Sequence, residues 1–279
     1  MPVLKRLLKD IPAVMGFLII AMIILTAIFA WQVAPLPTEV YGSNILERLQ
    51  PPSPDHLFGT DALGRDIFSR VLVGTRSALT IALSVVILAM AIGVPMGLYA
   101  GYASGWAAEL VMRLTDIFLA VPQLILALAV AQILSRGLES AMIALAMTYW
   151  PFFARTVFAE VQRTKTSLFV EALEGLGASP LRIAVCHLLP NVAAPIIVRA
   201  TLGMGFTILT SATLGFLGIG ATPPSPDWGL MIAESRQYLP ESWWYSTFPG
   251  LAILVTVLGF NLLGDGLRDI VDPRLRRSR

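Results

Sequence analysis

Two carboxylates lie close together in the stretch from His56 to Arg70, where paired acids could support general acid–base chemistry. Asp61 and Asp66 are five positions apart, and each is followed four positions later by an arginine, Arg65 or Arg70. A turn followed by a helix start explains this spacing as capping and local ion pairing. No second catalytic group accompanies the two acids. We therefore expect a structural motif made of Gly59, Thr60, Asp61, Gly64, Arg65 and Asp66.

The other reactive side chains are isolated from one another. A single cysteine, Cys186, excludes a disulfide within the chain, and His56 and His187 are too far apart in sequence to indicate a metal site. No histidine accompanies the hydroxyl groups of Thr80, Ser84 and Ser211. No Gly-x-x-x-x-Gly-Lys-Ser/Thr run is present to cradle a nucleotide. The sequence therefore predicts a protein that is not an enzyme and holds no metal or cofactor of its own.

The distribution of charge decides the class of protein. Charged residues make up 14% of the chain, against about 25% in typical soluble domains, and the mean hydropathy is +0.74. Residues 11–38, 77–108 and 242–264 contain no Asp, Glu, Lys or Arg. Each run exceeds the roughly 20 residues that cross a bilayer as a helix, which excludes a soluble domain. A net charge of +2 argues against a nucleic-acid partner, which usually requires a clustered basic face.

We predict an all-α fold, a polytopic membrane bundle of about six transmembrane helices. The predicted spans are residues 12–34, 78–101, 115–134, 140–158, 192–216 and 244–266. A β-barrel strand would alternate apolar and polar residues over about ten positions, whereas residues 81–88 are apolar on every face. Residues 1–77 would form an N-terminal stub, the first span and a long outer loop. Residues 78–279 would form the transmembrane core, with an inside loop at 159–191.

Lysine and arginine residues set the expected orientation. With the N-terminus inside, thirteen of them fall on the inner side and six on the outer side. The inside set is Lys5, Arg6, Lys9, Arg113, Arg155, Arg163, Lys165, Arg182, Arg268, Arg274, Arg276, Arg277 and Arg279. The outside set is Arg48, Arg65, Arg70, Arg76, Arg136 and Arg236. Both termini are therefore expected in the cytoplasm. The first apolar run is longer than a signal-peptide core and lacks a small-x-small cleavage site, so we expect it to stay as an uncleaved anchor.

The inside loop has the pattern of a helix, a tight turn and a second helix. The first helix would end at about Leu176, with Gly177 just beyond it, where glycine tolerates positive φ. Ser179 suits the N-cap of the second helix, which would end at about Leu189 because Pro190 discourages its continuation. One side would be apolar, formed by Leu173, Leu176, Leu181, Val185 and Leu188. Pattern alone leaves open whether the loop lies against the membrane or docks into a partner's groove.

Two further side chains are candidates for a solute pathway or gate. Arg199 falls within the fifth predicted span, near its inner end. An ionisable residue there is a functional candidate by default; snorkelling to the inner surface is the alternative. Trp228 either serves the pathway or marks the outer interface belt with Trp243 and Trp244. Arg155 is expected at the inner end of the fourth span. No row of intramembrane charges forms an ion relay, which argues against an ion-coupled secondary transporter.

The loop motif resembles the EAA loop of ABC importer membrane subunits. Glu171-Ala172, then Gly177 six residues after the glutamate, then Leu189-Pro190 match by position, and Leu173 replaces the usual third-position alanine. Three more stretches resemble the dipeptide/oligopeptide/nickel subfamily: residues 56–70, residues 214–220 followed by Trp228-Gly229, and residues 260–269 followed by Asp272-Pro273. The likeness covers nearly the whole chain after residue 50. The long first outer loop and the Asp-Pro ending resemble the C-type permease of a heterodimeric pair.

This resemblance implies a type I ABC importer transmembrane fold in the bacterial inner membrane. It implies that an ATPase docks on the loop at Glu171, Ala172, Leu173, Gly177, Leu189 and Pro190. The implied partners are a second homologous permease, two cytoplasmic ATPase subunits that bind ATP and Mg²⁺, and a periplasmic or lipid-anchored solute-binding protein. The implied solutes are di- or oligopeptides, with nickel, metal chelates, glutathione and opine-like compounds as alternatives.

Overall fold

The computed structural model describes residues 10–134 and 137–271 and builds them almost entirely from helices. Five helices are long: α2 (Ile11–Ile28), α4 (Ile67–Tyr102), α7 (Leu138–Lys165), α10 (Leu189–Phe216) and α12 (Trp244–Val271). Shorter ones are α3 (Ala30–Val33), α5 (Trp106–Ala120), α6 (Gln123–Ile133), α8 (Leu168–Gly175), α9 (Pro180–Arg182) and α11 (Trp228–Ser235). In the described residues, β-structure is limited to an isolated bridge between Thr60 and Asp66. The all-α fold class is confirmed.

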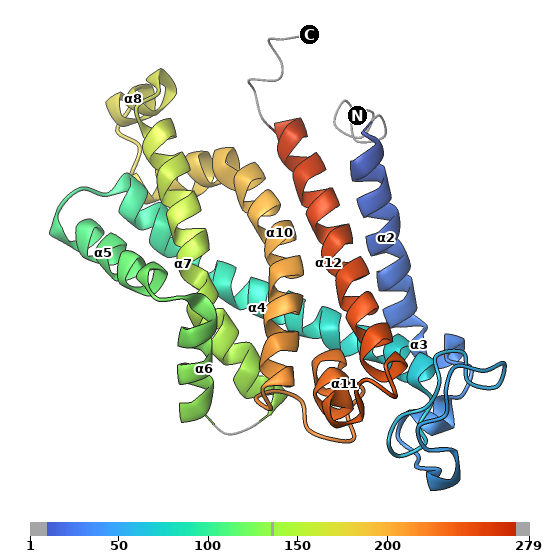
Figure 1. Ribbon diagram of the computed structural model, residues 1–279. Helices are drawn as coiled ribbons and strands as arrows, with labels where there is room; N and C mark the ends of the chain where they lie inside the picture. Colours follow the sequence, from blue (N-terminus) through green and yellow to red (C-terminus); the bar gives the residue numbers. More distant parts are fainter. Residues whose placement is uncertain (1–9, 135–136, 272–279) are drawn as a thin grey trace.

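The third predicted span, 115–134, falls on two helices and not on one. That region belongs to two helices, α5 and α6, which meet at 95° (Figure 1). The bend lies at Val121-Pro122, because proline cannot continue a helix and forces the residue before it into an extended conformation; Val121 has φ −89° and ψ 131°. The described residues thus contain five helices that are long and apolar enough to cross a membrane, or six spans if the bent pair counts as one.

The other spans are close to their predicted ranges, although several helices continue beyond them. Asp66 accepts a hydrogen bond from the Ser69 amide and starts α4 at Ile67, so the domain boundary expected at residue 77 falls inside this helix. The α7 helix runs to Lys165. Arg155 therefore does not lie at a helix end: it is ten residues before that end and forms an ion pair with Asp116 of α5.

Small residues let α4 and α7 pack closely. A Cβ on Gly93 would overlap the Trp150 carbonyl oxygen, and one on Gly97 would overlap that of Ala154. The same small-xxx-small spacing brings backbones together in many membrane helix pairs. Large side chains of α7, including Phe153 and Val157, are fully buried beside this contact. The pair forms the centre of the bundle, with α10 packed against both helices and α12 lying beside α2 (Figure 1).

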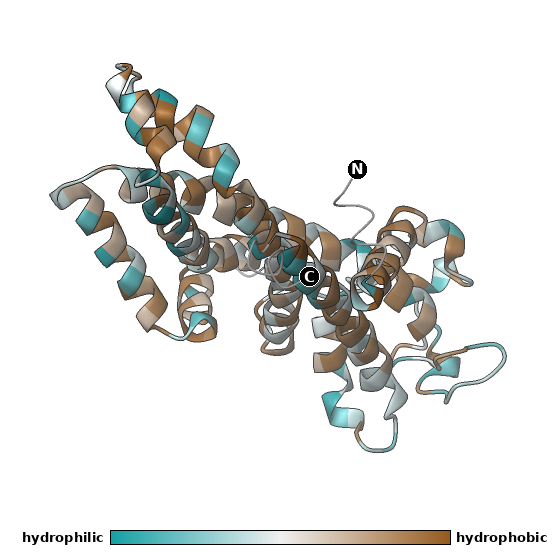
Figure 2. Ribbon diagram, turned by 90° about the horizontal axis from the view of Figure 1, so that it is seen from above, coloured by the Kyte–Doolittle hydropathy of each residue, from teal (hydrophilic) through white to brown (hydrophobic). Residues whose placement is uncertain are grey.

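The two ends of the bundle carry different structures. The first residues of α2, the last residues of α12 and helix α8 lie at one end, and α11 with the connecting segment 34–66 lies at the other (Figure 1). Hydrophobic residues predominate along the long helices, and hydrophilic residues gather in the segments that project from the bundle (Figure 2). The basic residues expected at the chain ends and in the 134–138 connection lie outside the described residues: Lys5, Arg6, Lys9, Arg136, Arg274, Arg276, Arg277 and Arg279.

Candidate functional site

The predicted helix–turn–helix projects from the end of the bundle at which α2 begins (Figure 1). Its first helix, α8, ends at Gly175 with Leu176 as its C-cap, and Gly177 follows with φ +76°. The Ala178 amide donates to the Leu173 carbonyl at 3.0 Å and the Gly177 amide to that of Glu174 at 2.9 Å, which is the Schellman pattern. The predicted position of Gly177 just past the helix is confirmed. A residue with a side chain would be strained there.

The second arm of the projection differs from the prediction. Ser179 caps it, as expected, by accepting a hydrogen bond from the Arg182 amide. The helix does not stop near Leu189: it continues through a π-helical segment, Ile183–Leu188, into the span α10. Pro190 lies in the first turn of α10, where a missing amide hydrogen is tolerated because the wider π turn precedes it. The second arm of the projection is therefore rigidly joined to a transmembrane helix.

The projection is held to the bundle by buried residues and leaves other apolar residues exposed. Val170, Ile183 and Leu188 are buried in the core cluster that contains Val157 and Val161 of α7. Leu168, Leu176 and Leu181 are exposed at 83%, 84% and 75%. The predicted apolar side is thus divided: Leu188 is buried, whereas Leu176 and Leu181 face outward. Of the remaining motif positions, Glu171, Ala172, Gly177 and Pro190 are exposed, and Leu173 and Leu189 are partly buried.

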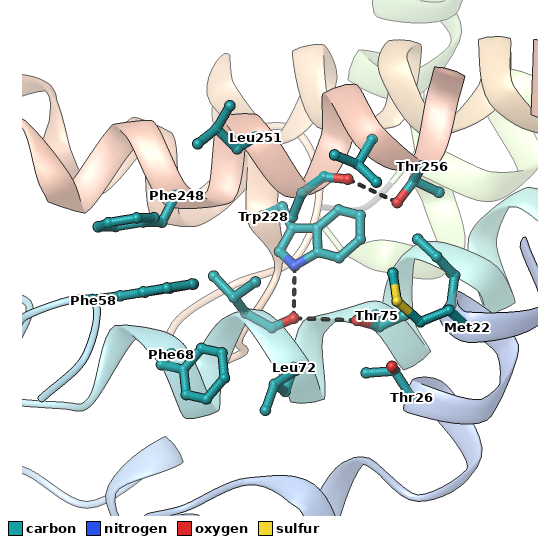
Figure 3. A pocket seen from close by; sticks show the side chains of 14 residues that line it. Met22, Thr26, Phe58, Phe68, Leu72, Thr75, Trp228, Phe248, Leu251 and Thr256 are labelled. Atoms are coloured by element: carbon teal, nitrogen blue, oxygen red, sulfur yellow. Dashed lines mark hydrogen bonds between the residues drawn. The ribbon is translucent and has the colours of Figure 1, made fainter. Parts of the chain in front are cut away.

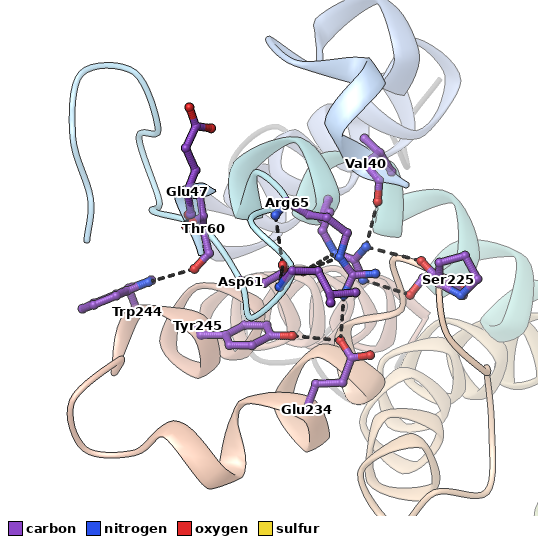
Figure 4. A network of polar contacts seen from close by, with 12 residues as sticks. Val40, Glu47, Thr60, Asp61, Arg65, Ser225, Glu234, Trp244 and Tyr245 are labelled. Carbon is purple, nitrogen blue, oxygen red and sulfur yellow. Dashed lines mark hydrogen bonds and ion pairs between the residues drawn. The ribbon is translucent and has the colours of Figure 1, made fainter. Parts of the chain in front are cut away.

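At the opposite end, the two acids of the outer motif have separate structural roles. Asp61 is fully buried and accepts hydrogen bonds from the Leu63 and Arg65 amides and from Arg65 Nε at 2.5 Å (Figure 4). Asp66 caps α4 and also contacts His56. Gly59 and Gly64 supply the positive φ angles of the intervening turns. The structure brings the acids and arginines together. Their contacts are those of turn and helix capping and of ion pairing.

The network around Asp61 extends to distant parts of the chain that were not predicted. Arg65 also reaches Glu234 of α11 at 3.3 Å, and Glu234 accepts a hydrogen bond from the Tyr245 hydroxyl at 2.8 Å (Figure 4). Arg70 is fully buried and donates to the carbonyl oxygens of Val40, Pro224 and Ser225. The network joins the segment 34–66, α4, α11 and α12 into one unit, which we call the outer cap after the predicted outer loop that it contains. No local sequence signal indicates contacts over such separations.

His56 lies inside this cap, surrounded by acids. Its Nδ1 is 3.1 Å from Asp66 and 3.9 Å from Glu39, and its Nε2 is 3.3 Å from Glu47. Burial lowers the pKa of His56, but the hydrogen bond to Asp66 and the surrounding negative charge outweigh it and leave the pKa above its ordinary value. For the Glu39 carboxyl, burial raises the pKa, because it disfavours the ionised form.

Trp228 and Trp244 are buried, so the prediction that they mark the outer interface belt is wrong for both. Trp228 is 3% exposed and donates from Nε1 to the Val71 carbonyl at 3.0 Å, while Trp244 donates to the Thr60 carbonyl at 3.3 Å. Trp228 forms a wall of an apolar cavity of about 340 Å³ between α2, α4 and α12 (Figure 3). The hydroxyls of Thr75 and Thr256 in its lining donate to carbonyls of their own helices. The cavity offers a polar solute little to bind.

Arg199 lies within α10 and does not snorkel to a helix end. Its guanidinium carbon is 4.7 Å from the centre of the Phe152 ring and 5.8 Å from that of Tyr149, both on α7. Its Nε is buried without a hydrogen-bond partner. Among the described residues no acid pairs with it. The structure thus places this ionisable group inside helix α10, and the aromatic contacts on α7 are new.

Comparison with known proteins gives consistent matches over most of the chain. The family described as "Binding-protein-dependent transport system inner membrane component" matches residues 93–277. The dipeptide transport system permease protein DppC of Alkalihalophilus pseudofirmus is 44% identical over 98% of this chain and 89% of its own length. The glutathione transport system permease protein GsiD of Pectobacterium atrosepticum is 40% identical over 98% and 90%. The inward-facing MetNI methionine ABC transporter covers 74% of this chain and 98% of its own, with a TM-score of 0.60 and 22% identity.

Proposed function

This chain belongs to the family of binding-protein-dependent transport system inner membrane components, and we propose that its solutes are di- or oligopeptides. It is a multi-pass inner-membrane permease of an ABC importer with the type I fold, working with a second permease, ATPases and a binding protein. One relative is named for dipeptides and another for glutathione, which is itself a tripeptide. These names favour peptides over the nickel, metal-chelate and opine-like alternatives.

The observation that carries the coupling role is the projection from α8 to Ile183. Its leucines Leu168, Leu176 and Leu181 expose apolar surface outside the membrane-spanning helices, and such a surface suits a groove on a partner. We propose that an ATPase subunit docks here, with Glu171 at the contact. ATP and Mg²⁺ would be bound by that subunit and not by this chain. The end of the bundle that carries α8 would then be cytoplasmic, and both termini with it.

The packing of the projection suggests how ATP hydrolysis would move the spans. Val170 and Ile183 share a core cluster with Val161 of α7, and the second arm continues into α10. A displacement of α8 by the ATPase would therefore move α7 and α10 as well. Because close-packed helices shift between discrete arrangements and do not deform continuously, this contact suits a two-state change between inward-open and outward-open forms.

The outer cap would receive the solute-binding protein. Its buried network ties the segment 34–66 to α11 and α12, so a protein that docks on it would meet a rigid surface. The motif Gly59, Thr60, Asp61, Gly64, Arg65 and Asp66 would act by holding this surface in shape. Trp228 would support the same cap from beneath, through its bond to Val71.

Uptake into proteoliposomes tests the solute. The two permeases and two ATPase subunits are reconstituted with their binding protein, and labelled dipeptide, glutathione and Ni²⁺ are compared. We expect ATP-dependent accumulation of dipeptide; accumulation of Ni²⁺ alone would contradict the proposal.

Reporter fusions after Lys165 and after Leu230 test the orientation. We expect a cytoplasmic signal from the first and a periplasmic signal from the second, and signals from the same side would contradict the proposed topology.

A further inference from the structure

Arg199 has no counter-charge among the described residues. It lies ten residues after the start of α10, about 15 Å along the helix axis at 1.5 Å per residue, so it is not at an end of this helix. The acids of the neighbouring helix α7, Glu139 and Glu160, lie near its two ends. No hydrogen bond or ion pair to another described residue satisfies the guanidinium, and its Nε is buried and unpaired. A guanidinium held between two helices without a counter-charge is available to a partner from outside the described chain.

The aromatic residues beside Arg199 hold its guanidinium in a defined place. Tyr149 is 3% exposed and is fixed against Gly203, where a Cβ would lie 2.6 Å from the Tyr149 hydroxyl oxygen. It also stacks on Phe206 at 6.1 Å between ring centres. Phe152 lies closer to the guanidinium, at 4.7 Å. Cation–π contact of this kind engages the face of the guanidinium and leaves its N–H edges available.

The chemistry of a guanidinium and of the proposed solutes indicates what binds there. A guanidinium presents N–H donors in a planar fork that matches a carboxylate in a bidentate pair. Peptides and glutathione carry a free carboxylate at the C-terminus. Charged residues in membrane spans usually face the interior of the assembly or a water-filled cavity and mark solute pathways. Resting on the proposed function, we propose that Arg199 binds the solute carboxylate within the membrane, on a face of α7 and α10 that lines the pathway between the two permeases.

Transport of paired substrates by the reconstituted importer tests this assignment. Uptake of a dipeptide and of the same dipeptide with a C-terminal amide is measured for wild type, Arg199→Gln and Arg199→Lys. Arg113→Gln removes one positive charge from the exposed face of α5 and is the matched control. We expect Arg199→Gln to lower uptake of the free acid about tenfold, the effect of losing one charge-assisted hydrogen bond, and to leave the amide nearly unchanged. Arg199→Lys should keep part of the uptake, because it keeps the charge without the fork.

Chemical modification gives a measurement that needs neither uptake nor the binding protein. In the purified complex, phenylglyoxal modification of Arg199 is followed by mass spectrometry. Millimolar free-acid dipeptide should slow this reaction, and the amide should not. Equal protection by both, or by neither, would overturn the assignment, as would an equal loss of uptake for both substrates. Failure of Arg199→Gln to assemble with the second permease would overturn it too, in favour of a subunit contact. Absence of peptide uptake by wild type would instead contradict the proposed solute.

Discussion

The Tyr102 hydroxyl, at the last residue of α4, donates a hydrogen bond to Glu174 of α8 at 2.9 Å. The bond links the projecting helix to α4 by a second route, independent of the continuous path through Ile183 into α10. Because α4 packs along α7, the bond connects the projection to the packed α4–α7 pair. The proposed coupling surface is thus attached to the spans on both of its sides.

We predict that Tyr102→Phe weakens coupling without abolishing it. The bond is solvent-exposed, so its loss should cost about 0.5 to 1 kcal/mol, or roughly two- to fivefold in solute-stimulated ATP hydrolysis. Tyr99→Phe, one turn earlier on α4 and half-exposed, is the matched control and should have no effect. Full stimulated hydrolysis in Tyr102→Phe would show that the path through α10 carries the coupling alone.

Gly177→Val should uncouple the ATPase while leaving the protein in the membrane. A β-branched residue at φ +76° costs about 1–2 kcal/mol for the left-handed conformation, and it would break the Schellman turn. We expect ATPase subunits to co-purify poorly and stimulated hydrolysis to fall. Gly175→Ala is the matched control, because a Cβ there meets no atom within 4 Å and alanine favours a helix. Normal stimulation in Gly177→Val would contradict the docking role of this turn.

Features that depend on nearby residues could be predicted from the sequence. Charge-free runs locate most of the spans, and Gly177 with Ser179 marks the turn of the projection because capping is decided within a few residues. The bend at Val121-Pro122 was not predicted, although Pro122 is a local signal, because the largely apolar region around it has the length of one span. Pro190 leads to the opposite error. It indicates the end of a helix, but the π-helical segment before it lets the helix continue.

Features that depend on distant residues could not be predicted. Arg65 and Glu234 are 169 positions apart, and no pattern in one sequence pairs them. The burial of Trp228 follows from its contact with Val71, 157 positions away, whereas composition alone suggested a residue at the membrane interface. At Arg199 the position within the span was predictable, but the aromatic neighbours on α7 appear only when α7 and α10 are packed together.

Arg70→Met should destabilise the outer cap strongly. Both Arg70 and Asp61 are fully buried, so removing the arginine leaves a buried carboxylate with less compensation and frees the carbonyls of Val40 and Ser225. Breaking a buried pair by removing one partner typically costs about 3–5 kcal/mol. Limited proteolysis between residues 40 and 66 should become faster in the variant. Arg76→Met, on an exposed position of the same helix, is the control; equal proteolysis in both variants would contradict the role of the network.

His56 should make the stability of the outer cap depend on pH. Its pKa is raised in the folded protein, so protonated His56 contributes a stabilisation that is complete below its unfolded value of about 6.5 and is lost as the pH rises through the raised value. The raised pKa of Glu39 acts in the same direction, because the ionised form is the one disfavoured by burial.

Hydrogen exchange of the amides in 44–66, corrected for intrinsic rates, should show protection falling between pH 6 and 9. His56→Gln should flatten this profile, whereas His187→Gln, on the π-helical segment at the opposite end of the bundle, should leave it unchanged. Protection that rises with pH, or an unaltered slope in His56→Gln, would show that the charges around His56 do not stabilise the cap.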